Sequence, residues 1–357
     1  MKSVDALMQQ AVDEKVFPGA VLLVSQSDRI VFHEAYGQAN IFTKQKITTG
    51  TIFDLASLTK PLATTLAVLL LVKEQRLQLS QELASVLPVF KGTEKEAITV
   101  EHLLAHHAGL PDYQPYYLAL SESPPEKRKA KLRDLLFKEP LIHPVGKTAV
   151  YSDVGFMLLN WIVETVASTT LDCFVVEKVY QPLCLNNLFF PGAGRRANKG
   201  PFAATEDCPW RRTVLEGVVH DENAYTMGGV EGHSGLFGTA EDIGRLLREL
   251  LSVHTEKNPA SIFNQKLLQH IFRRYNDSDR ALGFDTPAAQ NSSCGRYFSK
   301  DSVGHLGFTG TSFWMDLSKK ITVVLLTNRV HPSRDNTAIK EFRPKIHNAV
   351  MEVFADA

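Results

Sequence analysis

The sequence predicts an α+β protein in which one antiparallel sheet is built from both ends of the chain and flanked by terminal helices. Strand-like runs gather near the N-terminus and again near the C-terminus, whereas the pattern between them is mostly helical. We therefore expect residues 1–51 and 236–357 to form a sheet domain and residues 52–235 an inserted, mainly helical domain. An active site in such a layout should lie in the cleft between the two.

Composition sets outer bounds on this interpretation. The chain has 357 residues, 44% of them hydrophobic and 22% charged, which is typical of a soluble globular protein with a large core. Its 39 basic residues balance 39 acidic ones, so charge gives no reason to expect a nucleic acid or an anionic membrane as partner. The longest apolar run, Leu66 to Val72, is too short to span a bilayer.

The first elements expected are a helix and a hairpin. Apolar residues at helical spacing predict an amphipathic first helix: Val4, Leu7, Met8, Ala11 and Val12. Two strand-like runs follow, Ala20–Ser25 and Arg29–Ala35, joined by the polar turn Gln26-Ser27-Asp28. These two strands supply the N-terminal part of the sheet.

Localisation follows from the start of the chain and from its cysteines. The first helix lacks the continuous apolar stretch of a signal peptide. Four scattered cysteines include no Cys-x-x-Cys pair and no metal-binding spacing, which fits a reducing compartment. We expect a cytoplasmic protein, or a periplasmic one if a leader was removed.

The remaining elements follow in chain order, without repeats or low-complexity segments. Helices are expected in the middle at Val100–His106, Glu126–Phe137 and Gly155–Val166. Strands are expected near the end at Val303–Phe308, Ser312–Met315 and Ile321–Thr327, and a closing helix should begin near Pro344.

The motif Ser57-Leu58-Thr59-Lys60 places a hydroxyl and an amine one helical turn apart at the start of a strongly apolar segment. Asp54 is a plausible N-cap, and Pro61 requires the helix to begin close to Ser57. A serine becomes a good nucleophile when a neutral lysine accepts its proton. The helix dipole and burial should lower the pKa of Lys60. The alternative is a capping serine beside a solvated lysine.

Two later segments look suited to line the same cleft. The first, Tyr151-Ser152-Asp153, precedes a helix, and a tyrosine near a lysine can carry protons. Alternatively, the tyrosine is simply buried, and Ser152 or Asp153 caps the helix. The run from Gly304 to Thr311 has three glycines that let a substrate approach the backbone, or it is only a glycine-rich turn.

Together the three segments resemble a known family. In order, they carry Ser57-x-x-Lys60, Tyr151-x-Asp153 and His305-x-Gly307. These resemble the active-site motifs of the serine penicillin-recognising enzymes, which include class C β-lactamases, low-molecular-weight penicillin-binding proteins and β-lactamase-like esterases. The resemblance covers nearly the whole chain and implies a β-lactamase/transpeptidase-like fold.

The resemblance also implies a role for each residue. Ser57 would attack an acyl carbonyl and form an acyl-enzyme, with Lys60 as general base and Tyr151 relaying the proton. The backbone N–H groups of Ser57 and Phe308 would form the oxyanion hole. His305 would take the position of the cation that binds substrate or tunes proton transfer.

Two departures from the family pattern affect the substrate. Asp153 replaces the usual asparagine, and a carboxylate only accepts hydrogen bonds and favours a charged lysine. His305 and Leu306 stand where β-lactamases usually carry lysine and threonine, which favours esterase or peptidase-like work over β-lactam hydrolysis. Arg329 and Arg334 either supply the missing positive charge or serve solubility.

The stretch from residue 191 to 225 is long and poor in regular pattern, so it is either a lid over the site or a structural wrap. Asn223, His220 and Trp210 are candidate substrate contacts within it.

Two other classes of protein remain possible from the sequence. A zinc hydrolase would use His102 and His106, but no third ligand is apparent and Glu101 stands on the wrong side for the His-Glu-x-x-His motif. A catalytically silent binding or regulatory member of the same fold is the second. The interpretation we favour is a serine hydrolase without metal or cofactor that acts on a small-molecule or peptide substrate: an ester, a D-amino-acid peptide or amide, or a β-lactam. The sequence does not specify the oligomeric state.

Overall fold

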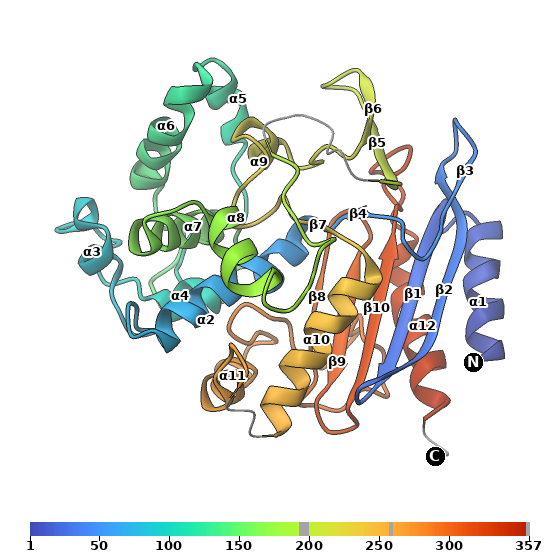
Figure 1. Ribbon diagram of the computed structural model, residues 1–357. Coiled ribbons are helices and arrows are strands. Elements are labelled where there is room, and N and C mark those ends of the chain that lie inside the picture. The colour runs from blue at the N-terminus through green and yellow to red at the C-terminus, as the bar shows by residue number, and fades with distance from the viewer. Residues whose placement is uncertain (193–199, 257–259, 355–357) are drawn as a thin grey trace.

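A six-stranded antiparallel sheet with the strand order β3-β2-β1-β10-β9-β8 forms one side of the molecule (Figure 1). The structure, a computed structural model, describes residues 1–192, 200–256 and 260–354. The two ends of the chain meet at the centre of the sheet, where Ala20 lies opposite Thr327. The strands are β1 (Gly19–Gln26), β2 (Arg29–Asn40), β3 (Gln45–Lys46), β8 (Val303–Leu306), β9 (Ser312–Asp316) and β10 (Ile321–Thr327).

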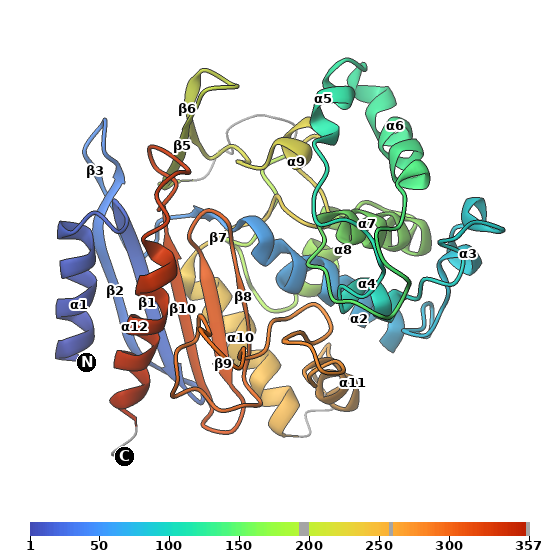
Figure 2. The same cartoon turned by 180° about the vertical axis from the view of Figure 1, so that it is seen from behind.

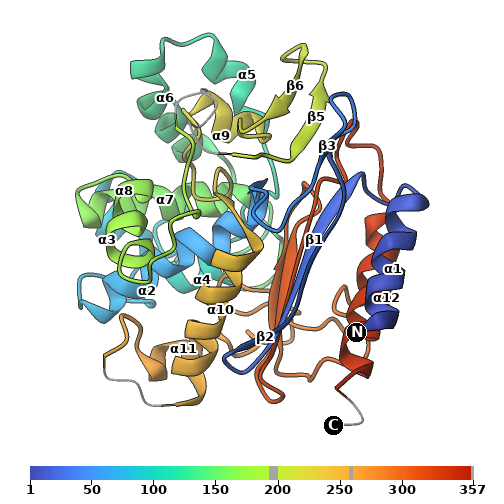
Figure 3. The same cartoon turned by 45° about the vertical axis from the view of Figure 1, so that its right-hand side comes forward.

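The central strands are apolar on both faces and therefore separate two cores. In β1, Val21 and Leu23 face one apolar cluster whereas Ala20 and Leu22 face the other, as the two-residue period of a strand requires. Helices α1 (Lys2–Asp13) and α12 (Ile339–Glu352) cover one face, and α10 (Ala240–Thr255) covers the other (Figure 3). The predicted sheet between terminal helices is confirmed, with α10 as an additional layer.

The C-terminal third differs from the expectation in two ways. Helices α10 and α11 (Gln265–Ile271) lie in a part of the chain for which only strands were expected. Helix α12 begins at Ile339, five residues before Pro344, so the prediction that it starts near the proline is wrong. The N–H groups of Lys340 and Glu341 donate to the carbonyls of Thr337 and Ala338, and this turn starts the helix before the proline is reached.

The helical side of the molecule is built around α2 (Thr65–Lys73), which is almost wholly buried (Figure 2). A 3₁₀ turn (Ala56–Leu58) and a π turn (Lys60–Thr64) lead into it. The other helical elements are α3 (Leu83–Val86), a 3₁₀ turn (Pro88–Phe90), α4 (Val100–Leu104), α5 (Tyr116–Ser121), α6 (Pro125–Lys138), α7 (Asp153–Ala167), α8 (Leu171–Val175), a π turn (Val176–Tyr180) and α9 (Glu222–Thr226).

Among the described residues, the stretch Ala56–Lys73 is long and apolar enough to cross a membrane by length and composition alone. It is 83% buried inside the protein, as the core helix of a globular domain is. A second apolar stretch passes the same test only as the pair Asp153–Ala167 and Leu171–Tyr180, which is bent by 68°.

The segment from 191 to 225 contains more regular structure than its sequence suggests. Strands β5 (Ala204–Cys208) and β6 (Thr213–Glu216) pair as a hairpin beyond one end of the main sheet (Figure 1). Residues 193–199 of this segment lie outside the described residues. A further two-stranded pair is formed by β4 (Phe53–Asp54) and β7 (Phe237–Gly238). Strand β4 ends shortly before Ser57 in the sequence. The domain boundaries near residues 51 and 235 stay a prediction.

Candidate active site

Ser57 lies in a tight turn between β4 and the buried helix α2. Ala56 adopts a left-handed backbone conformation with φ of 46°, which is strained for an alanine and occurs most often where function requires it. The buried Asp54 carboxylate fixes the turn by accepting from the N–H of Ala56 at 2.9 Å and of His220 at 2.7 Å. Asp54 is therefore an anchor of the turn rather than the simple helix cap expected.

Lys60 is fully buried and is the centre of the site. Its Nζ lies 3.1 Å from Ser57 Oγ and donates to the carbonyl of His233 at 3.2 Å. The same Nζ forms an ion pair with Asp153 at 2.6 Å and lies 4.7 Å from the centre of the Tyr151 ring. The first two motifs of the sequence therefore meet around one ammonium group, and Lys60 is not the solvated lysine of the alternative interpretation.

The start of α7 presents Tyr151 and Asp153 to this lysine. Ser152 caps the helix: its Oγ accepts from the N–H of Gly155 at 3.0 Å and donates to the carbonyl of Pro111 at 2.6 Å. The N–H of Ser152 donates to Nδ1 of the buried His106. Both interpretations of this segment therefore hold. Ser152 caps the helix, and its two neighbours, Tyr151 and Asp153, contact Lys60.

The expected fall in the pKa of Lys60 is wrong in direction. Burial does lower this pKa, but the charge of Asp153 and the contacts with Tyr151 outweigh it and raise the pKa above its usual value. The pKa of Tyr151 is also raised, mainly by burial, although the charge of Lys60 and hydrogen bonds with Lys60 and Ser57 oppose that shift. At rest the site therefore holds an ammonium, paired with Asp153, and a neutral phenol.

The end of β8 supplies the third motif. His305 is 2% exposed, its Nδ1 lies 2.9 Å from the carbonyl of Leu306, and its ring centre is 5.9 Å from that of Tyr151. Burial lowers the pKa of His305 to about 4, so the ring is neutral near pH 7. His305 therefore does not supply the cation that was expected at this position.

The turn at Gly307 and Phe308 packs against the chain just before Ser57. A Cβ on Gly307 would lie 2.6 Å from the carbonyl of Leu55, so only glycine allows this close approach. Within the described part of the chain, the N–H groups of Ser57 and Phe308 donate to no protein acceptor. Ser57 and Phe308 line the same cleft, and two free donors that point at one position can stabilise an oxyanion.

These groups open into a cleft of about 710 Å³. It is lined by residues from both the sheet side and the helical side, among them Ser57, Tyr113, Tyr151, Asp153, His305 and Phe308. Arg329 and Arg334 also line it, but neither is a freely solvated surface charge. Arg329 is 7% exposed and donates to the carbonyl of Phe308, whereas Arg334 is paired with Glu206 and Glu222.

The three candidates from segment 191–225 have different positions. His220 lines the cleft, where its ring stacks on Phe308 at 5.6 Å. Asn223 is 1% exposed and holds α5 in place by accepting from Tyr117 N at 2.8 Å and donating to the carbonyl of Gln114. Asn223 is absent from the cleft lining, so this geometry speaks against a direct substrate contact. Trp210 packs on Tyr117 and is likewise outside the lining.

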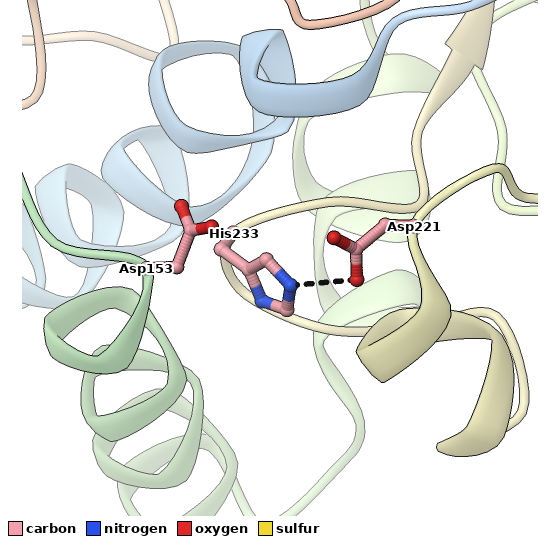
Figure 4. A group of neighbouring side chains, drawn as sticks. All are labelled: Asp153, Asp221 and His233. Carbon is pink, nitrogen blue, oxygen red and sulfur yellow. Dashed lines mark hydrogen bonds and ion pairs between the residues drawn. The ribbon is translucent and has the colours of Figure 1, made fainter. Parts of the chain in front are cut away.

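The two histidines of the zinc alternative do not form a metal site together. Nδ1 of His102 accepts from the N–H of Thr99, and Nδ1 of His106 accepts from that of Ser152. A different group, Asp153, Asp221 and His233, does bring ligand atoms within 4.8 Å of one another (Figure 4). Within it, His233 pairs with Asp221 at 2.9 Å, and Lys60 already provides the cation for Asp153.

Comparison with known proteins identifies the family. The sequence model described as Beta-lactamase matches residues 4–346. An N-acetylmuramyl-L-alanine amidase of Bacillus subtilis is 33% identical, over 93% of this chain and 81% of that protein. An Escherichia coli protein named as a D-alanyl-D-alanine carboxypeptidase is 32% identical, over 93% and 82%. The chain belongs to the β-lactamase family, whose members named here are hydrolases.

Solved structures agree on the fold. EstCE1, described as a hydrolase with promiscuous acyltransferase activity, superposes with a TM-score of 0.74 at 23% identity and covers 96% of this chain and 98% of its own. The octameric penicillin-binding protein homologue from Pyrococcus abyssi gives 0.73 at 20% identity, covering 95% and 76%. The predicted β-lactamase/transpeptidase-like fold is therefore confirmed.

Proposed function

We propose that this protein is a serine hydrolase that works through an acyl-enzyme on Ser57. The observation that carries the proposal is the 3.1 Å contact between Ser57 Oγ and Lys60 Nζ, with Asp153 at 2.6 Å on the same nitrogen. A pure binding module has no need of a fully buried lysine in contact with a serine hydroxyl, because such a charge is costly to bury.

The raised pKa of Lys60 requires an additional proton step before acylation. The ammonium first passes a proton to the Asp153 carboxylate, which leaves a neutral amine beside the serine. The amine then takes the Ser57 proton as Oγ bonds to the acyl carbon and the carbonyl electron pair moves to oxygen. The N–H groups of Ser57 and Phe308 stabilise that oxyanion.

Collapse of the tetrahedral intermediate releases the leaving group. The bond to the leaving group breaks, and the leaving group takes the hydroxyl proton of Tyr151. Tyr151 is reprotonated from Lys60, and Lys60 recovers its proton from Asp153. Water then attacks the acyl-enzyme with the same groups acting in reverse.

The substrate class follows from the charges in the cleft. His305 is neutral near pH 7 and so does not supply the fixed charge with which β-lactamases hold a substrate carboxylate. Asp153 gives the substrate an acceptor in place of an amide donor. These features support esters and D-amino-acid peptides or amides ahead of β-lactams. Relatives named as an amidase and a carboxypeptidase, and a structural neighbour described as a hydrolase with promiscuous acyltransferase activity, are in line with this.

A substrate panel tests this proposal. Purified protein and its Ser57→Ala variant are assayed with p-nitrophenyl esters of increasing acyl length, a D-alanyl-D-alanine peptide and a chromogenic cephalosporin. We expect turnover of an ester or the peptide that is lost in Ser57→Ala, with the cephalosporin slowest. Equal rates for the two proteins on every substrate would instead indicate the catalytically silent member of the fold.

A further inference from the structure

The two donors of the proposed oxyanion hole belong to segments far apart in the sequence. The first is the nucleophile turn at residues 54–58, and the second is the turn at residues 307–311 between β8 and β9. Donors stabilise an oxyanion only when both point at the same position, so the distance between these segments has to be fixed by something.

Two buried threonines join the segments. Thr309 Oγ1 donates to the carbonyl of Asp54 at 2.7 Å, and Thr311 Oγ1 donates to the carbonyl of Leu55 at 3.1 Å. Their side chains are 1% and 0% exposed. Both hydroxyls therefore cross from the 307–311 turn to the chain directly before Ser57.

The second contact acts on the turn that carries the nucleophile. The carbonyl of Leu55 also accepts from the N–H of Leu58 at 3.0 Å and so starts the 3₁₀ turn that holds Ser57. Thr309 in turn directly follows Phe308, the second donor. The two hydroxyl contacts thus lie close in sequence to both N–H groups. They restrict the movement of one segment relative to the other.

We propose that Thr309 and Thr311 are positioning residues that join the two halves of the oxyanion hole and set the distance between the N–H groups of Ser57 and Phe308. This inference rests on the proposed function for its catalytic consequence. The structural consequence does not depend on the proposed function. When the hydroxyls are removed, the backbone hydrogen bonds of both segments should open more often.

The chain provides a matched control in Thr327. This residue is also buried, and its Oγ1 donates to the carbonyl of Gly310 in the same turn at 3.0 Å. It lies at the end of β10 and makes no contact with the nucleophile turn among the hydrogen bonds of the described residues. Thr327→Val therefore removes a hydrogen bond of the same kind from the same turn without cutting the connection to Ser57.

The experiment compares Thr309→Val and Thr311→Val with Thr309→Ser, Thr311→Ser and Thr327→Val. The rate constant for labelling Ser57 by a fluorophosphonate should fall about 10- to 100-fold in the first two, because small misplacements of donors are costly. It should stay within about threefold of wild type in the serine variants and in Thr327→Val. If a valine variant does not fold, the corresponding alanine variant replaces it.

Hydrogen–deuterium exchange supplies the second readout and needs no activity. Loss of either crossing hydroxyl should speed exchange in peptides covering both 53–59 and 307–311, whereas Thr327→Val should affect only the latter. Unchanged exchange at 53–59 in both valine variants would overturn the proposal, as would a labelling loss in Thr327→Val as large as theirs. If wild type takes no label, the proposed function fails, and the exchange data alone decide whether the two segments are coupled.

Discussion

The contacts of Lys60 define the chemistry of the site more than any other single residue. Its nitrogen lies between a serine hydroxyl, a carboxylate and a backbone carbonyl, and it is fully buried. Most of its neighbours favour the ammonium form, and the balance raises its pKa despite the burial. Asp153 therefore both holds the proton on Lys60 and, at 2.6 Å, is placed to accept it, so that without its charge the amine should become neutral at lower pH.

Asp153→Asn should move the activity of the site to lower pH. The substitution removes the charge that raises the pKa of Lys60, so burial then dominates and lowers it. The labelling rate of Ser57 rises with pH as the amine loses its proton, and that rise should occur at lower pH in the variant. The measurement is the fluorophosphonate labelling rate between pH 5 and 10, where the rate of wild type should still be rising at the upper limit because its Lys60 pKa is raised above the usual value.

Asp285→Asn is the control for this pH profile. Asp285 lines the same cleft but pairs with Arg280 instead of Lys60. Its loss should leave the labelling profile as it is in wild type. A profile of Asp153→Asn that matches wild type, or that rises only at higher pH, would contradict the role given to this carboxylate.

Residue patterns predicted which side chains meet but not their protonation. Ser57 and Lys60 are recognisable because they stand one helical turn apart, and Asp153 is recognisable through the resemblance of its motif to that of a known family. The expected fall in the pKa of Lys60 was based on burial and on the helix start. It did not include the effect of the Asp153 carboxylate, because only the folded chain shows that this group lies 2.6 Å from Lys60 Nζ. For the same reason, sequence alone did not show that His305 is buried and neutral.

At the scale of elements, the junction between β8 and the nucleophile turn depends on one glycine. Gly307→Ala would place a methyl group against the Thr311 hydroxyl and 2.6 Å from the carbonyl of Leu55. We expect it to cost about 1–3 kcal/mol of unfolding free energy through overpacking. The labelling rate should fall by at least about tenfold as the two segments are forced apart.

Gly50→Ala is the matched control, because a Cβ there has only the Thr48 hydroxyl within reach, at 4.0 Å. Urea unfolding gives the stability of both variants and intact-mass kinetics gives their labelling rates. If Gly307→Ala labels as fast as Gly50→Ala, the close approach at Gly307 is not needed for the oxyanion hole.

Individual elements were predictable where a short apolar run is bounded by turn residues. The hairpin of β1 and β2 and the strands β8, β9 and β10 were located within a few residues. Helix α10 was missed although its buried residues, Ile243, Leu246, Leu247 and Leu250, have clear helical spacing. The start of α12 was missed because the rule that places proline in the first helical turn was applied too strictly to Pro344.

At the scale of the whole molecule, the pairing of β1 with β10 makes the site depend on both ends of the chain. The proposed nucleophile, Ser57, comes from the first third of the chain, whereas the proposed donor, Phe308, comes from the last. The strand composition of both ends predicted this arrangement. The contacts that align the two donors, such as those of Thr309, could not be predicted because they join residues 255 positions apart.

Buried histidines should make the whole fold sensitive to acid. Burial lowers the pKa of His347, in α12, to about 4. Its unfolded value is about 6.5, so the unfolded state binds more protons between these limits and stability falls as the pH drops from 6.5 to 4. His347→Gln should reduce that slope by up to about 1.4 kcal/mol per pH unit.

Urea unfolding at pH values from 7 to 4 measures this slope for both proteins. The comparison with wild type isolates His347 from oppositely acting groups such as Glu231, whose pKa burial raises to about 7. Identical slopes for wild type and His347→Gln would show that His347 does not stay neutral in the folded protein.

The central claim is that Ser57 is a nucleophile activated by Lys60, and the mass of the intact protein after reaction with a fluorophosphonate tests it most directly. Wild type should gain the mass of one phosphonyl group, and peptide mapping should locate it on Ser57. Ser57→Ala should gain none, and Lys60→Met should label far more slowly while remaining folded. An adduct that persists in Ser57→Ala, or a wild-type protein that takes no label, would contradict the account.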